Sequence, residues 1–201
     1  MEEKLSKSNL VFITTSKIVR RLSESLNTSN TKAILSKLRN SIGRPLNENI
    51  EGIKLIYEYM PEELYREFST LTYEELAILT TLQLYSIHQQ SKMDSVNAEE
   101  KTGSWNNIGE SFSSLRGTEG NEAFDRRFNA LITSQSFEEL SHHLRQLLKI
   151  LKSKQENIKV NYPKLSKDLY DFKRGYDERV RLNWSRAYYS IKFKGEDKNE
   201  K

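Results

Sequence analysis

The sequence predicts an all-α fold, a compact bundle of roughly eight to ten helices, and three observations support this. Apolar residues recur three and four positions apart along most of the chain, as on the buried face of a helix. No segment alternates apolar and polar residues as a half-buried strand does, and no Asn-Gly or Asp-Gly hairpin turn occurs. The 201 residues include only 8 Gly and 3 Pro, too few for the many turns of a β-sandwich.

The first quarter of the chain predicts two helices. Ile18 and Leu22 lie on one face of the first helix. The second helix begins at Thr31, whose side chain can cap it, and ends at Gly43. Pro45 then prevents any continuation of the helix.

The most apolar segment, residues 76–87, predicts the central helix. A short helix over residues 53–57 precedes it and ends before Pro61, which opens a further turn. Thr72 and Glu75 resemble a capping box at the start of the apolar segment. Because this segment is apolar on every side, we expect it to be buried all round, at the centre of the fold.

The second half of the chain predicts a loop and then more helices. Residues 92–103 are polar and aperiodic, which favours a mobile loop. Beyond it, Ser136 can cap the strongest of the later helices. We expect one domain over residues 1–193 and a charged, frayed tail over residues 194–201. The later helices are predicted around residues 105–115, 124–131, 137–151, 163–172 and 180–191.

Charge and composition narrow the functional classes. The net charge is +4, made of +5 over residues 1–50, −7 over residues 51–133 and +6 over residues 134–201. A basic face therefore forms if the N-terminal and C-terminal segments lie together in the fold. The absence of Cys excludes disulfides, thiolate metal sites and a Cys nucleophile. No Gly-rich phosphate loop, signal peptide or membrane span is visible, so we expect a cytoplasmic protein without a membrane partner.

The histidines and carboxylates form no recognisable catalytic motif. His142 and His143 point to different sides of their helix, and no His-x-x-x-His or His-Glu-x-x-His pattern occurs. For His88, at the end of the central helix, a hydrogen-bonded structural role is favoured over catalysis. Acidic pairs such as Glu74-Glu75 fall at predicted helix N-termini, where the helix dipole stabilises them. We therefore expect no enzymatic activity, no metal and no cofactor.

Rows of cationic side chains carry the stronger functional signal. Arg145, Lys149 and Lys152 share one face of a predicted helix whose leucines occupy the other face. Lys37 and Arg44 are predicted to share a face of the second helix. Long cationic side chains in such rows suit the phosphates of a nucleic-acid strand, and an ordinary solvated helix face is the alternative interpretation.

Several short motifs also resemble those of the CasB family, in that family's order. Each motif alone is weak, but five or six of them in order are specific, and they cover about residues 32–190. The chain reads LRNSIGRP at residues 38–45, LYSIHQ at 84–89, DRRFNALI at 125–132, HLRQLL at 143–148, and YPKL at 162–165 followed by DL at 168–169 and WSRAYY at 184–189. These segments resemble the family elements LRR…GRP, LYALHQ, ERRF..LL, LRQLV and DY..L..DL…WAR.YY.

This resemblance implies a fold of two packed helical lobes and a non-catalytic role. CasB proteins are the small subunit of the type I-E CRISPR surveillance complex, Cascade, with two copies arranged head to tail. The implied partners are crRNA, target and non-target DNA, other Cascade subunits and a second copy of the chain, with no small-molecule substrate. The implied role is to hold the region where the guide pairs with its target and to stabilise the displaced strand of the R-loop. R-loop formation replaces one duplex by another of similar stability, so protein contacts to the nucleic-acid backbone can shift the equilibrium.

The resemblance and the basic rows together select candidate nucleic-acid contacts. Two positions depart from the family pattern: Asn40 stands where a second Arg is frequent, and Glu110 reverses the charge of an Arg in the usual LGRAL element. The first-rank candidates are Arg39, Arg44, Arg126, Arg127 and Arg145, and the second-rank candidates are Lys37, Arg116, Lys149 and Lys152.

Two other functional classes stay open on the residues alone. A helical adaptor that binds only protein would show no salt-dependent affinity for nucleic acid. A metal-dependent helical nuclease or phosphohydrolase would need carboxylates that converge in space around Mg²⁺ or Mn²⁺. The adaptor is the stronger alternative, because a subunit of a large complex also has extensive protein interfaces.

Overall fold

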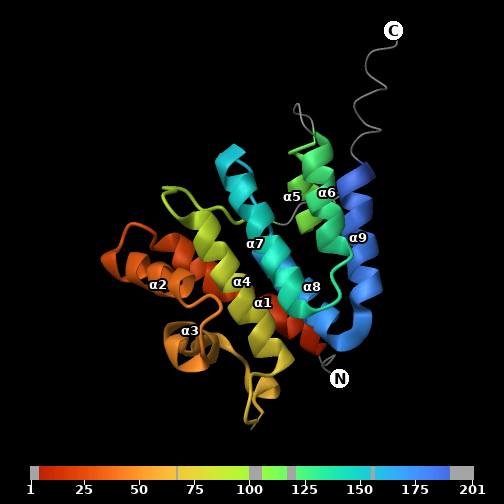
Figure 1. The fold of residues 1–201 in the computed structure, drawn as a ribbon. Helices are drawn as coiled ribbons and strands as arrows, with labels where there is room; N and C mark the ends of the chain where they lie inside the picture. Colours follow the sequence, from red (N-terminus) through yellow and green to blue (C-terminus); the bar gives the residue numbers. More distant parts are fainter. Residues whose placement is uncertain (1–4, 67, 100–105, 117–120, 155–156, 191–201) are drawn as a thin grey trace.

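The computed structural model describes residues 5–66, 68–99, 106–116, 121–154 and 157–190 and is helical, as the sequence predicts (Figure 1). Within these ranges an isolated bridge between Asn97 and Val160 is the only β-type pairing. The elements are α1 (Lys7–Glu24), α2 (Ser29–Asn40), η1 (Leu46–Glu48), α3 (Ile50–Tyr59), η2 (Glu62–Leu64), α4 (Tyr73–Gln89), α5 (Ile108–Ser113), α6 (Asn121–Ile132), α7 (Phe137–Lys154), α8 (Tyr162–Asp171), η3 (Phe172–Tyr176) and α9 (Asp177–Ser190).

Helix α4 forms the centre of the fold, which confirms the prediction from its apolar sequence. It packs against α1, α2, α3, α7 and α8. Its start is fixed by the predicted capping box: Glu75 N donates to the Thr72 hydroxyl, and Thr72 N donates to the Glu75 carboxylate. Because α4 is covered on all sides, even its polar residues Thr81, Ser86 and His88 are buried.

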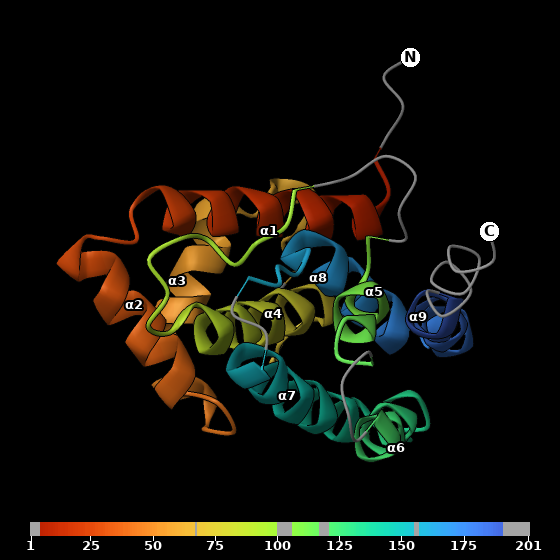
Figure 2. The ribbon, with the colours of Figure 1, turned by 90° about the horizontal axis from the view of Figure 1, so that it is seen from above.

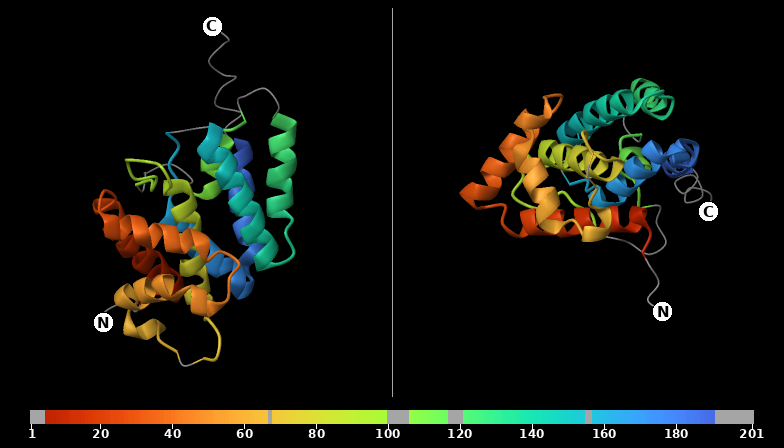
Figure 3. Two further views of the ribbon diagram at one scale, coloured as in Figure 1. Left: turned by 60° about the vertical axis from the view of Figure 1, so that its left-hand side comes forward. Right: turned by 90° about the horizontal axis from the view of Figure 1, so that it is seen from below.

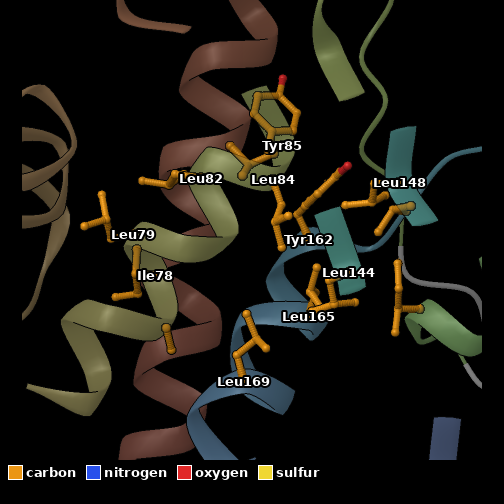
Figure 4. Packing of buried hydrophobic residues seen from close by; sticks show 14 of the residues in the cluster. Ile78, Leu79, Leu82, Leu84, Tyr85, Leu144, Leu148, Tyr162, Leu165 and Leu169 are labelled. Carbon is orange, nitrogen blue, oxygen red and sulfur yellow. The ribbon is translucent and has the colours of Figure 1, made fainter. Parts of the chain in front are cut away.

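The other helices surround α4 and α8 in two groups. Helices α2 and α3 lie on one side, α5, α6 and α9 on the other, and α1 and α7 between them with α4 and α8 (Figure 1). Seen from above, α1 and α7 lie on opposite faces of the layer that α4 and α8 form (Figure 2). In the core, Leu84 of α4, Tyr162 and Leu165 of α8, and Leu144 of α7 lie close together, whereas Leu82 is buried on the other side of α4 (Figure 4).

Helix α2 begins and ends earlier than predicted. Its N-cap is Thr28, whose hydroxyl accepts from Thr31 N, and Thr31 itself is buried, with its own hydroxyl hydrogen-bonded to Ser25. The helix ends at Asn40, and Gly43 has a φ of 72° in the turn that follows. The positive φ explains why glycine occupies this turn.

The segment predicted as a mobile loop is anchored in its first part. Ala98 N donates to Val160 O at 2.9 Å, and Val160 N donates to Val96 O at 3.0 Å. Val96 is buried, and the side chain of Gln89 accepts from its backbone N–H. This part of the segment is a loop without helix or strand, as predicted, but it is paired with the distant residue 160, which the spacing of polar residues did not indicate; its mobility stays a prediction. Residues 100–103 and the tail from residue 194 lie outside the described residues.

Candidate nucleic-acid interface

Helix α7 presents cations on the side opposite to its leucines. Leu144, Leu148 and their neighbours at helical spacing are buried in the core. Lys149 is exposed, and Arg145 and Lys152 are half-buried. The helical repeat places these three side chains along the outer face, as the sequence predicts.

One edge of this outer face meets the C-terminal ends of α2 and α4. Arg39, in the last turn of α2, donates a hydrogen bond from Nη1 to the Ser86 carbonyl of α4 at 3.1 Å. Lys152 Nζ donates to the side-chain oxygen of Gln90, just after α4, at 3.3 Å. Cations are favoured at these positions, because helix C-termini carry a partial negative charge.

The basic groups at this junction repel one another. Burial lowers the pKa of Lys152, and the charges of Arg39 and Lys92 lower it further. Burial and the charges of Lys92 and Lys152 likewise lower the pKa of His88 to about 4. The folded chain therefore gathers positive charge here, which is the electrostatic condition for binding a polyanion.

The opposite edge of α7 forms a groove with α6. Its volume is about 480 Å³, and its polar lining comes from Arg126 and Arg127 of α6 and from His142, His143 and Gln146 of α7. Both arginines are exposed. The nearest carboxylate oxygen to Arg126 belongs to the exposed Glu122 and lies 4.0 Å from Nη1 of Arg126. Such an exposed pair is weak, so it leaves the guanidinium available to a phosphate.

The two edges and the outer face of α7 lie on one side of the molecule (Figure 2), and we call their cations together the cationic face. The C-terminal end of α2, α7 and α6 lie along the same side of the molecule (Figure 2). The cationic face comprises Arg39, Arg126, Arg127, Arg145, Lys149 and Lys152.

Arg116, a second-rank candidate, lies away from the cationic face and has partners within the fold. Its side chain is only 11% exposed, and Nε lies 3.1 Å from the Asp125 carboxylate. The guanidinium also stacks on the rings of Tyr188 and Tyr189, 4.9 Å from each ring centroid. Arg116 therefore joins the end of α5 to α6 and α9. The sequence gave no sign of this burial, because Tyr188 and Tyr189 are distant in the chain and Asp125 lies on the next helix.

Lys37 and Arg44 do not share a helix face, because α2 ends at Asn40. Lys37 Nζ is 2.7 Å from the Glu51 carboxylate of α3, which lowers the pKa of Glu51. Arg44 is exposed and lies 4.0 Å from Glu48. Both cations remain solvent-accessible but belong to the α2–α3 side of the molecule.

Sequence reasoning missed four groups that line or border the cationic face. Lys92 lies in the segment predicted as a loop, and only the fold brings it to Lys152. His142 and His143 were considered only as metal ligands, and Gln146 was noted only within a family motif. The basic residues on the neighbouring α6 were the signal that could have identified them as the second wall of a groove.

Comparisons with known proteins identify the family and the fold of the chain. The profile of the family described as CRISPR-associated protein Cse2 matches residues 34–189, most of the chain. The chain belongs to the Cse2 family. Cse2 is the CasB family that the sequence motifs resemble, and its members form the small subunit of type I-E Cascade. No curated protein sequence matches the chain.

Two solved CasB structures share the fold of this Cse2 chain. The crystal structure of CasB from Thermobifida fusca superposes with a TM-score of 0.70 at 24% identity, covering 90% of this chain and 98% of that one. For the crystal structure of M. ruber CasB the TM-score is 0.68 at 20% identity, covering 91% of this chain and 98% of that one.

The two departures from the family pattern have clear positions in the Cse2 fold. Asn40 is exposed at the end of α2, next to Arg39. The Glu110 carboxylate accepts a hydrogen bond from Asn106 N at 2.7 Å, at the start of α5. The negative charge of Glu110 therefore stabilises a helix N-terminus.

Carboxylates do not converge on a metal site in the described part of the chain, where no group of three or more His, Asp or Glu residues could hold an ion. The buried carboxylates have protein partners instead: Asp168, for example, accepts from Trp184 Nε1 at 2.8 Å and from Lys164 Nζ at 2.6 Å. Burial raises the pKa of Asp168 against the pull of Lys164. None of the described helices combines the length and apolarity that crossing a bilayer requires.

Proposed function

We propose that this chain is a non-catalytic Cascade subunit that holds nucleic acid on its cationic face, contacting crRNA and target DNA and stabilising the displaced strand of the R-loop. The observation that carries the proposal is the gathering of six cations from α2, α6 and α7 on one side of the molecule. Membership of the Cse2 family supports the same role. We further propose that it acts in the cytoplasm, beside a second copy of itself.

The mechanism is electrostatic. Arg and Lys side chains neutralise backbone phosphates and release counterions, without reading base sequence. In Cascade, base pairing with the guide supplies sequence specificity, so the protein needs only backbone contacts. The α6–α7 groove holds arginines whose planar guanidinium can contact a phosphate through two hydrogen bonds.

A salt titration of the isolated chain tests this proposal. We expect affinity for single-stranded DNA and RNA to fall steeply with salt, and Arg126→Ala with Arg145→Ala to reduce the slope of log K against log salt by about 1.4. The matched control is Arg20→Ala with Arg186→Ala, which removes the same charge from exposed positions on α1 and α9. An equal loss of slope in both pairs contradicts a role for the cationic face. Salt-independent binding of protein partners only would favour the adaptor alternative.

A further inference from the structure

The end of the molecule formed by α3 and the segment that leads into α4 lies apart from the cationic face (Figure 3). Two hollows open there, with volumes of about 570 and 440 Å³. They share Arg66, Phe68, Thr70 and Leu71 in their linings and so form one groove, which we call the α3 groove. None of the residues of the cationic face lines it.

The larger hollow is apolar. Leu46, Ile50 and Tyr57 line it and are 49%, 53% and 46% exposed, and Phe68 at the shared wall is 70% exposed. Single exposed apolar side chains are ordinary, but four that line one hollow form a contiguous patch of the kind found at interaction sites. An apolar lining of this kind favours a protein segment over a nucleic-acid backbone.

The smaller hollow is cationic. Lys7, Arg66 and Arg174 line it, opposite one carboxylate, Glu74. Glu74 is only 6% exposed and is already engaged, because it accepts from Lys7 Nζ at 3.0 Å and from the Tyr170 hydroxyl at 3.4 Å. The described lining therefore keeps an excess of positive charge.

The carboxylate of the apolar hollow is also occupied. Glu75 accepts from the backbone N–H of Thr72 at 2.7 Å and from the Tyr57 hydroxyl at 2.5 Å. Lys54, in contrast, is exposed on the wall of this hollow. Both halves of the α3 groove thus offer cations to an incoming ligand.

We propose that the α3 groove binds an acidic segment of a protein partner within the assembled complex. Apolar side chains of that segment fill the hollow beside Phe68 and Ile50, and its carboxylates pair with Arg66 and Arg174. The excess of positive charge in the lining favours a segment with acidic side chains, and the apolar lining favours a peptide over a nucleic acid. The proposal does not depend on the cationic face, because the two surfaces share no residues.

Photo-crosslinking in reconstituted Cascade identifies the occupant. p-Benzoylphenylalanine is placed at position 68, where Phe68 is 70% exposed, and as the control at position 93, where Met93 is 78% exposed. We expect position 68 to crosslink to one protein segment that contains both acidic and apolar residues. Crosslinks from position 68 to RNA or DNA, to a basic segment, or to no subunit would overturn the proposal.

Charge reversal provides an independent test. Arg66→Glu with Arg174→Glu should lower the affinity of the chain for the rest of Cascade at least tenfold, whereas Arg20→Glu with Arg186→Glu, the same change in net charge, should leave it within about twofold. Circular dichroism checks that both variants stay folded, and Phe68→Ser, at an exposed position, supplies a second variant. Wild-type assembly by both groove variants would contradict the proposal. Loss of nucleic-acid affinity by the isolated chain, beyond that of the charge-matched control, would also contradict it.

Discussion

Nδ1 of His88 lies 2.9 Å from the hydroxyl of Tyr162, in the buried contact between α4 and α8. Both side chains are fully buried, and the ring of Tyr162 also packs edge-on against Tyr85 at a centroid distance of 5.2 Å. The Nε2 atom of His88 is buried without a hydrogen-bond partner in the described structure. His88 is thus a structural residue of the core, and its charged form is unfavourable there.

The position of His88 predicts that the protein loses stability in mild acid. Its folded-state pKa is about 4, below the value of about 6.5 in an unfolded chain. Between these values the unfolded state binds more protons, so stability falls as the pH decreases from about 6.5 to about 4. The loss from this group approaches about 3 kcal/mol. Urea unfolding as a function of pH measures it. His88→Gln should flatten this part of the profile, whereas His142→Gln, at an exposed position, should not.

A close approach of α5 to α9 predicts that Gly109 tolerates no side chain. A Cβ atom at Gly109 would collide with the backbone carbonyl of Trp184, which cannot move aside as a flexible side chain could. Gly109→Ala should therefore cost about 1–3 kcal/mol of stability. Gly43→Ala is the control, because a Cβ there meets nothing within 4 Å and only the positive φ penalises it. Equal thermal denaturation midpoints of the two variants would contradict this account.

Arg116 should act on stability rather than on nucleic-acid binding. Its removal leaves Asp125 without its cationic partner and exposes the stacked faces of Tyr188 and Tyr189. Arg116→Ala should destabilise the fold by about 1–3 kcal/mol. Under conditions where the variant is folded, the salt slope of its binding should equal that of the wild type. A reduced slope without a loss of stability would show that Arg116 contacts phosphate instead.

Gln90→Glu should separate binding from stability at the junction of α2, α4 and α7. A carboxylate at this position would meet Lys152, whose Nζ already contacts Gln90, and would offset the repulsion with Arg39 and Lys92. We expect stability to be unchanged or slightly higher. The relief of that repulsion offsets the unfavourable interaction of the new carboxylate with the negative, C-terminal end of the α4 dipole. Affinity for single-stranded DNA should fall several-fold. An unchanged affinity would place the bound strand elsewhere on the molecule.

The sequence predicted the elements whose causes are local. The capping box at Thr72 and the all-round apolar pattern of α4 depend on neighbouring residues, and both were predicted correctly. The pairing of Val96 with Val160 and the burial of Arg116 against Asp125 and Tyr188 depend on distant residues. No local pattern could reveal them.

The candidate interface shows the same division. The row of cations on α7 followed from helical spacing. The groove, in which His142 and His143 of α7 face α6, could not be predicted without knowing how α7 packs against α6. The approach of Lys92 to Lys152 likewise depends on how α7 packs against α4.

The lifetime of the R-loop in reconstituted Cascade tests the role of the cationic face most directly. Complexes are assembled with the wild-type chain, with Arg126→Ala plus Arg145→Ala, or with the control pair Arg20→Ala plus Arg186→Ala, and dissociation of a labelled target is followed. The cationic-face pair should shorten the lifetime at least tenfold, with the greatest effect at low salt where phosphate contacts are least screened. The control pair should leave it unchanged. Equal lifetimes for all three complexes would contradict the account.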